Sequence, residues 1–286
     1  MFFALCLIWG SSFVLMKIGM FTADGGMALS AWQVAALRIF SSGLVLLPFA
    51  FNAWKNIPRQ KRGIVLLSGW LGSFIPAILF CLAESRIDSS LAGTLNAITP
   101  LSTIFIGWGL YRISVGASRF LGIMVGLSGC ILLFVNKATG TDSHPLFASF
   151  VVVATLCYGW NVHIVRRHLT GIGSLHIATM AFVGLVPFSF ILLWYTGFFA
   201  LPLGQPLYLK ATLAGTALGM VGTAFASVLF YKLVKMAGAL FASLVTYGIP
   251  FIAIGWGAVY GETITLLQIA ALAIILAGVY LANKEW

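Results

Sequence analysis

Long apolar runs separated by short polar breaks make up almost the whole chain. Each run is about 20 residues of nearly continuous hydrophobic character, unlike the strict alternation of barrel strands. A helix that crosses the roughly 30 Å hydrocarbon core of a bilayer needs about 20 apolar residues. The breaks predict ten membrane-spanning helices at about residues 1–20, 30–52, 63–84, 89–111, 119–136, 146–167, 174–196, 208–232, 238–260 and 265–283.

The composition agrees with a membrane location. The chain is 61% hydrophobic and only 8% charged, whereas about a quarter of the residues in a soluble domain are charged. Such a chain cannot hide its apolar surface from water in a single core, so lipid must be the solvent for most of it. We therefore expect an all-α integral membrane protein. It has no separate soluble domain, because no loop is long enough to form one.

Basic residues gather in alternate loops. If the N-terminus is cytoplasmic, the outer side holds only Arg86, Lys137 and Lys210. The inner side then holds Lys55, Arg59, Lys61, Arg62, Arg112, Arg119, Arg166, Arg167, Lys232, Lys235 and Lys284. Cytoplasmic loops carry an excess of Lys and Arg. The net charge of +10 is therefore a topology signal and not a sign of nucleic-acid binding, and it predicts that both termini are cytoplasmic.

The second half of the chain repeats the first. Shifts of 149 and 150 residues align Ser12 with Asn161, Gly72-Ser73 with Gly222-Thr223, Leu79-Phe80 with Leu229-Phe230, and Pro100 with Pro250. The predicted repeats are 1–137 and 146–286. Each holds five spans, an odd number, so the second must insert inverted relative to the first. Inverted repeats point to transporters, although some channels also contain them.

Several motifs carry a resemblance to a known family. Trp-Gly-Ser-Ser-Phe at 9–13, the paired Pro100 and Pro250, and Gly261-Glu262 resemble the drug/metabolite transporter superfamily, specifically its EamA-type ten-helix exporters. The resemblance implies an exporter of amino acids, sugars, nucleotide-linked metabolites or drugs. The first half departs from the second in carrying Tyr111-Arg112 where the second carries Gly261-Glu262.

Arg38 is the deepest charge in the chain. It lies about nine residues into the second predicted helix, roughly 12 Å below the outer boundary at 1.5 Å per residue. A central arginine costs about 2.5 to 3.5 kcal/mol on insertion scales. Arg38 could bind a carboxylate or a phosphate with its planar guanidinium, or it could bond helix-end carbonyls in a structural role.

Other polar and aromatic side chains also lie within the spans. Small polar residues either stitch helices together or line a cavity, and buried aromatic residues either form core or lipid contacts or suit an apolar ligand. The candidate substrate-binding residues are Ser11, Ser12, Arg38, Asn96, Tyr158, Trp160, Asn161, Thr246 and Tyr247.

The sequence also argues against several functions. It has no phosphate-binding loop, no catalytic triad and no metal-ligand spacing, so we expect no ATP, no cofactor, no metal and no enzymatic activity. All six carboxylates lie near loops or ends, which disfavours cationic drugs. We predict a secondary transporter in a bacterial cytoplasmic membrane, a monomer or homodimer in lipid, that exports a small zwitterionic or anionic metabolite such as a neutral or aromatic amino acid. The alternatives are a sugar-phosphate or nucleotide-type exchanger, a channel and a lipid-modifying enzyme.

Overall fold

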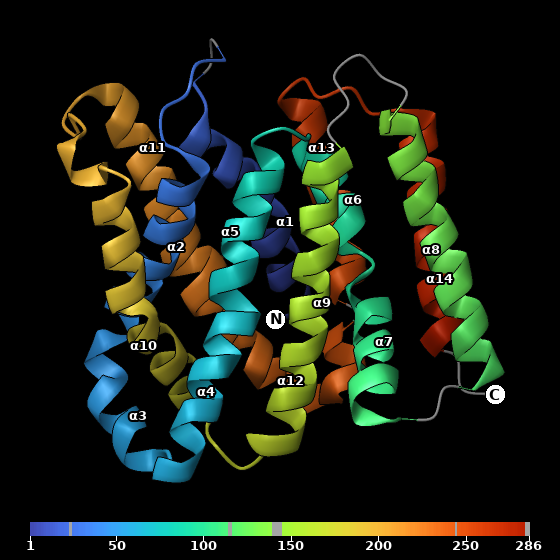
Figure 1. Ribbon diagram of the computed structural model, residues 1–286, viewed down its shortest axis with the longest axis horizontal. Helices are drawn as coiled ribbons and strands as arrows, with labels where there is room; N and C mark the ends of the chain where they lie inside the picture. Colours follow the sequence, from blue (N-terminus) through green and yellow to red (C-terminus); the bar gives the residue numbers. More distant parts are fainter. Residues whose placement is uncertain (23–24, 114–115, 139–144, 244, 284–286) are drawn as a thin grey trace.

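The computed structural model describes residues 1–22, 25–113, 116–138, 145–243 and 245–283, and these residues are almost entirely helical (Figure 1). The helices of the first half are α1 (Phe2–Met20), α2 (Ala31–Leu46), α3 (Ala50–Asn56), α4 (Arg62–Gly69), α5 (Ile75–Glu84), α6 (Ser89–Asn96), α7 (Thr99–Tyr111) and α8 (Ala117–Ala138). Those of the second half are α9 (Pro145–His168), α10 (Ser174–Tyr195), α11 (Pro206–Ala217), α12 (Ala226–Ser243), α13 (Val245–Val259) and α14 (Leu266–Asn283).

The apolar helices fall where the hydrophobic runs predict them. Six helical runs are long and apolar enough to cross a membrane, and α6 with α7 forms a seventh that is bent by 41°. Shorter apolar helices lie at Phe120–Leu132, Val245–Val259 and Leu266–Ala282. Within the described residues, these segments account for all ten predicted positions. The expected all-helical membrane fold is confirmed.

Local departures from regular α-helix occur at equivalent places in the two halves. A π-helical turn (Trp70–Phe74) joins α4 to α5, and a second one (Leu218–Phe225) joins α11 to α12. π turns of this kind are frequent at functional sites. The bend between α6 and α7 comes directly before Pro100, which lies in the first turn of α7, where the missing N–H of proline costs no hydrogen bond within the helix. Helix α12 continues through the break expected at 232–238.

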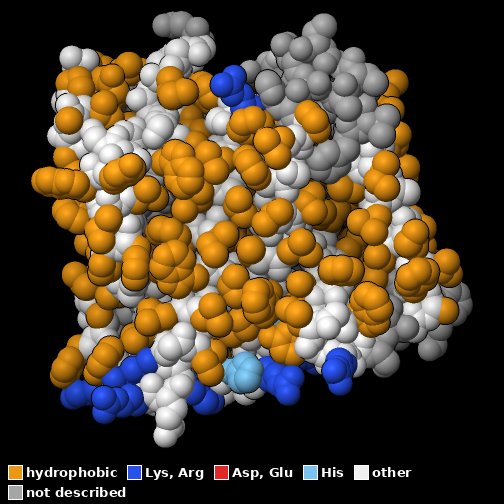
Figure 2. All heavy atoms as spheres, viewed as in Figure 1, with side chains coloured by type: hydrophobic (Ala, Val, Ile, Leu, Met, Phe, Trp, Pro, Cys, Tyr) orange, Lys and Arg blue, Asp and Glu red, His pale blue; other side chains and the backbone are white. Residues whose placement is uncertain are grey.

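The two halves run in opposite directions. In Figure 1, α1 leads to a connection at the top of the view, whereas its counterpart α9 leads to one at the bottom. Lys and Arg side chains gather at the bottom in the matching view of Figure 2, below a broad apolar band. By the positive-inside rule the bottom is the cytoplasmic face. The protein is therefore built from two inverted repeats, and α14 ends towards the cytoplasmic side.

Small residues let the helices of the two repeats pack closely. A Cβ atom added to Gly10 of α1 would collide with Ile252 of α13, and one added to Gly93 of α6 would collide with Ala253 of the same helix. Gly159, the repeat mate of Gly10, lies against the backbone of α7 in the same way. The first two contacts bring α1 and α6 against α13, and the third brings α9 against α7.

Candidate functional site

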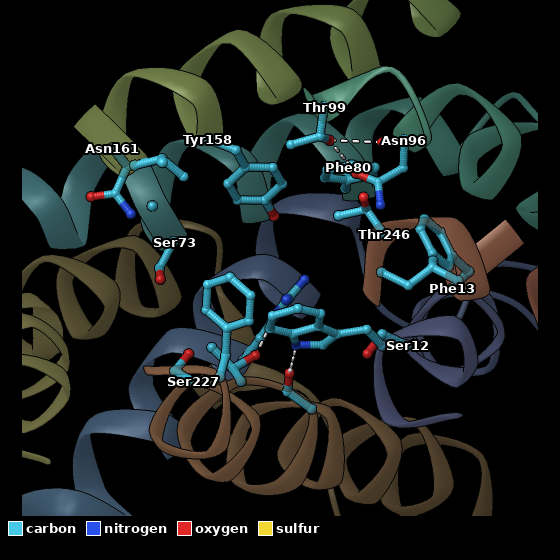
Figure 3. A pocket seen from close by; sticks show the side chains of 18 of the residues that line it. Ser12, Phe13, Ser73, Phe80, Asn96, Thr99, Tyr158, Asn161, Ser227 and Thr246 are labelled. Atoms are coloured by element: carbon cyan, nitrogen blue, oxygen red, sulfur yellow. Dashed lines mark hydrogen bonds between the residues drawn. The ribbon is translucent and has the colours of Figure 1, made fainter. Parts of the chain in front are cut away.

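A cavity of about 170 Å³ lies between the two repeats. Its walls come from α1, α2, α5, α6, α7, α9, α12 and α13 and from both π turns. In Figure 3 the hydroxyl of Tyr158 and the amide of Asn96 point into the space that Thr246 also borders. The candidate binding residues come from the first, second, fourth, sixth and ninth predicted spans, and each of these spans contributes a side chain to the cavity wall.

Equivalent residues of the two repeats line the cavity together. It contains both members of the repeat pairs Ser12 and Asn161, Asn96 and Thr246, Ser73 and Thr223, and Phe80 and Phe230. Each pair contributes one side chain from each half. The cavity therefore lies on the pseudo-symmetry axis that relates the two repeats, where a single pocket can be offered to either side of the membrane in turn.

Arg38 breaks this symmetry. The same shifts place Pro187 or Phe188 at its equivalent in the second half. The Nε of Arg38 donates a hydrogen bond of 2.6 Å to the hydroxyl of Thr223, and its Nη1 lies 4.0 Å from the sulfur of Met16. The Thr223 hydroxyl in turn donates to the carbonyl of Leu218 at 3.1 Å. Helix α2 of the first repeat is thus tied to the π turn of the second.

The guanidinium keeps donors available to a ligand. The guanidinium of Arg38 contacts a hydroxyl and a thioether. In the described part of the chain it makes no ion pair, and it does not donate to the carbonyls at a helix end, as a purely structural arginine would. A guanidinium has five N–H donors. Within the described residues no Asp or Glu lines the cavity, so Arg38 gives the cavity a positive charge that an anionic group can neutralise.

Aromatic rings form the rest of the wall. The rings of Phe80 and Tyr158 stack with centroids 6.1 Å apart, and Phe13 meets Phe80 edge-on at 5.8 Å. On the opposite side Trp9 packs against Phe230 at 5.1 Å, and the Trp9 indole N–H donates to the carbonyl of Gly222 at 3.1 Å. The arrangement combines a cation, small polar groups and flat apolar surfaces, which suits an organic ligand with an anionic end.

Six of the nine predicted binding residues line the cavity. They are Ser12, Arg38, Asn96, Tyr158, Asn161 and Thr246. The structure places Ser11, Trp160 and Tyr247 elsewhere. Ser11 accepts a hydrogen bond of 2.8 Å from the indole of Trp256, Trp160 is 39% exposed on the outside of α9, and Tyr247 is half-buried outside the cavity wall. Each is next in sequence to a lining residue, and one helical step turns a side chain by about 100°.

Other lining residues were not expected from the sequence. They include Trp9, Ser73, Phe80, Thr99, Thr223, Ser227, Phe230 and Tyr231. The repeat alignment already paired Ser73 with Thr223 and Phe80 with Phe230. Equivalent positions of inverted repeats meet where they lie close to the axis, so polar or aromatic pairs in the middle of the spans were a usable signal for these four residues.

An all-helical membrane body with two inverted repeats around a polar and aromatic cavity is typical of a transporter of small molecules. The sequence model of the EamA-like transporter family matches residues 1–135 and again residues 146–284. The chain therefore belongs to the EamA-like transporter family, a family of the drug/metabolite transporter superfamily, and carries two copies of its repeat.

Similar proteins extend over nearly the full chain. The uncharacterized inner membrane transporter YedA of Escherichia coli is 24% identical over 98% of this chain and 89% of its own length. The uncharacterized transporter YoaV of Bacillus subtilis is also 24% identical, over 96% of this chain and 92% of its own length. A crystal structure with 16% identity covers 99% of this chain and 94% of that one with a TM-score of 0.64, which shows the shared fold.

Proposed function

We propose that this secondary transporter exports a small zwitterionic or anionic metabolite, such as a neutral or aromatic amino acid, across the inner membrane of a bacterium. The single observation that carries the proposal is Arg38, a cation in the cavity wall with no carboxylate partner among the described residues. A half-buried guanidinium within the hydrocarbon layer is costly when it makes no ion pair, and a substrate carboxylate offers bidentate hydrogen bonds to it.

The neutral polar groups suit the rest of an amino acid. The amide of Asn96 and the hydroxyl of Tyr158 border the cavity away from the aromatic pair Trp9 and Phe230. Uncharged oxygens can accept hydrogen bonds from an ammonium group without holding it as tightly as a carboxylate would. The aromatic faces suit an apolar or aromatic side chain.

Size favours an amino acid over larger anions. Pockets for drug-sized ligands measure roughly 300 to 1,000 Å³, whereas this cavity measures about 170 Å³. A sugar phosphate or nucleotide-type metabolite could also use Arg38, but it would need the cavity to widen considerably. Alternating access then follows from the inverted repeats, whose two conformations exchange as the cavity changes sides.

A counterflow screen in liposomes tests the proposal. Purified protein is reconstituted into liposomes, and each batch of liposomes is loaded with one compound from a panel of amino acids, sugar phosphates, nucleotides and lipophilic cations. Exchange of each compound across the membrane is then measured with and without a pH gradient. We expect neutral or aromatic amino acids to exchange, and we expect an excess of the same amino acid on the far side to stimulate flux, as it does for a carrier and not for a channel. Transport of tetraphenylphosphonium-like cations without any amino acid would refute the proposal.

A further inference from the structure

The outer end of helix α6 is held by a carboxylate from the other repeat. Glu262 follows the end of α13, and its Oε1 and Oε2 accept hydrogen bonds from the backbone N–H groups of Ser89 and Ser90 at 2.8 and 2.9 Å. The first N–H groups of a helix lack partners within the helix, and its N-terminus favours a negative charge. Glu262 therefore caps α6 across more than 170 residues of sequence.

The local chain does not provide this cap. The residue at the N-cap position of α6 is Asp88, a residue type that commonly caps helices, yet its side chain makes no capping hydrogen bond. The structure also keeps space for Glu262. A Cβ atom at Gly257 would lie 2.5 Å from Glu262 Oε2, and Gly261 turns the chain at a φ of +79°. The sequence around Glu262 is thus suited to bringing its carboxylate onto α6.

A second carboxyl group contacts the same helix end from its own repeat. Glu84, the last residue of α5, is fully buried, and its Oε2 accepts a 3.0 Å hydrogen bond from the hydroxyl of Ser89. Its Oε1 has no hydrogen-bond partner. Because Glu84 and α6 both belong to the first repeat, their contact does not cross between repeats. The Glu262 contact does.

Helix α6 links this cap to the cavity. All eight of its residues are buried, and it lies beside α13 (Figure 1). Gly93, midway along α6, packs against Ala253 so closely that nothing can pass between the two helices. The last residue, Asn96, borders the cavity, and its side-chain oxygen accepts a bond from Thr99 at the bend. Opening the cavity outward between α6 and α13 requires breaking the Glu262 cap.

Among the residues that the structure describes, no carboxylate forms a matching cap on the inner side. The repeat mate of Glu262 is Arg112, which is exposed and adopts a left-handed φ of +53°. An arginine has no acceptor atoms in its side chain, so it cannot bond helix N–H groups. We infer that Glu262 is the positioning residue of the outer gate: its carboxylate fastens the second repeat to α6 and favours the conformation that is closed to the outside. The inference does not depend on the substrate.

Accessibility of the cavity from outside tests this role. Met16 borders the cavity from α1 and is 2% exposed. In protein whose four native cysteines are replaced, Met16→Cys is labelled in right-side-out proteoliposomes with a membrane-impermeant maleimide. We expect Glu262→Ala to raise the labelling rate about tenfold, which corresponds to about 1.4 kcal/mol. Glu262→Gln retains one acceptor oxygen of two, so its rise is smaller.

Two further variants make the test decisive. Asp88→Asn changes the acid at the same helix end that does not cap α6, and it should leave labelling at the parent rate. Gly257→Ala keeps the Glu262 charge but crowds both its carboxylate and the Cβ of Ser90 on α6, so it should raise labelling at least as much as Glu262→Ala does. If Glu262→Ala fails to fold, Gly257→Ala and Glu262→Gln decide the result. Parent-like labelling in these variants, or an equal rise in Asp88→Asn, would overturn the inference.

Discussion

The two repeats differ in charge at two equivalent positions. At the first position the first repeat carries a cation and the second an apolar residue; at the other position the first repeat carries a cation and the second a carboxylate. Arg38 of α2 corresponds to Pro187 or Phe188 of α10, and Glu262 after α13 corresponds to Arg112 after α7. By contrast, both members of several equivalent pairs, such as Ser12 with Asn161 and Phe80 with Phe230, line the cavity. The shared features build a pocket that either side can reach. The differing residues give that pocket its charge and distinguish its two ends.

The difference also follows from the membrane itself. A charge within the hydrocarbon layer costs several kcal/mol, so it is kept where it has a specific partner. Phe188 is 47% exposed and packs beside Trp70 on the outside of the bundle, where an arginine would meet lipid. Arg38 meets Thr223 of the other repeat instead. A single cation on one repeat is enough to make the cavity positive, because both repeats line the same cavity.

The largest effect is expected at Arg38. Arg38→Ala removes the cavity cation that we assign to the substrate carboxylate, and we expect counterflow to fall about 100-fold or more, since a desolvated carboxylate that loses its charged hydrogen-bond partner costs about 2 to 5 kcal/mol. Arg38→Lys retains the charge but not the planar fork, so it should recover part of the activity. Lys210→Ala, which removes a cation from the exposed start of α11, is the matched control. Unchanged counterflow in Arg38→Ala would remove the anion site.

Alanine substitutions at the repeat mates Phe80 and Phe230 should have different effects, one mainly on stability and the other mainly on substrate binding. Phe80 is 4% exposed between Phe13 and Tyr158, so Phe80→Ala leaves a cavity in the core and should lower the unfolding free energy by about 3 kcal/mol. Phe230 is half-buried beside Trp9, so Phe230→Ala should cost less stability. It should instead weaken aromatic substrates about fivefold relative to small ones. Thermal melting and competition assays on both variants measure these effects, and equal losses of stability would contradict this distinction.

A smaller effect separates the glycine mates Gly107 and Gly257. A Cβ atom at Gly107 would lie 3.0 Å from the ring of His163, whereas one at Gly257 would meet the Glu262 carboxylate. Gly107→Ala should therefore lower stability by about 1 to 3 kcal/mol through crowding without changing access to the cavity from outside. Gly257→Ala should change that access. Maleimide labelling and melting of both variants compare the inner and outer ends directly, and equal labelling would mean that the two ends are equivalent.

The ten spans could be predicted because lipid imposes a length on every apolar run. The ends of α5, α7 and α13 lie within one residue of the expected boundaries. The π turns could not be predicted, because a shift in hydrogen-bond register leaves hydropathy unchanged. The bend between α6 and α7 was marked only by Pro100. The break expected at 232–238 rested on Lys232, Lys235 and Gly238, but lysine is a good helix former, and α12 continues through it.

The cavity residues could be predicted in type but not in direction. Ser11 and Ser12 are equally polar neighbours, and a helix that is apolar on all sides gives no stripe to show which of them faces inward. The cap of α6 was hidden for a different reason. Glu262 and Ser89 are 173 residues apart, and the Asp88 beside Ser89 offered a local cap that the fold does not use. Only the packed structure brings the outer ends of α6 and α13 together.

The smallest effects on substrate binding are expected at Ser11 and its repeat mate Trp160, which both lie outside the cavity wall. Trp160→Leu replaces one exposed apolar side chain with another, so stability should stay within about 0.5 kcal/mol and the substrate KM should not change. Ser11→Ala leaves the Trp256 indole N–H without its acceptor and should cost about 1 to 3 kcal/mol, again with an unchanged KM. Ser12→Ala, one residue further along α1, alters the cavity wall and should raise the KM severalfold. If Ser11→Ala and Trp160→Leu raised the KM as much as Ser12→Ala does, the substrate would contact residues outside the cavity. That result would contradict the assignment of substrate binding to the residues that line the cavity.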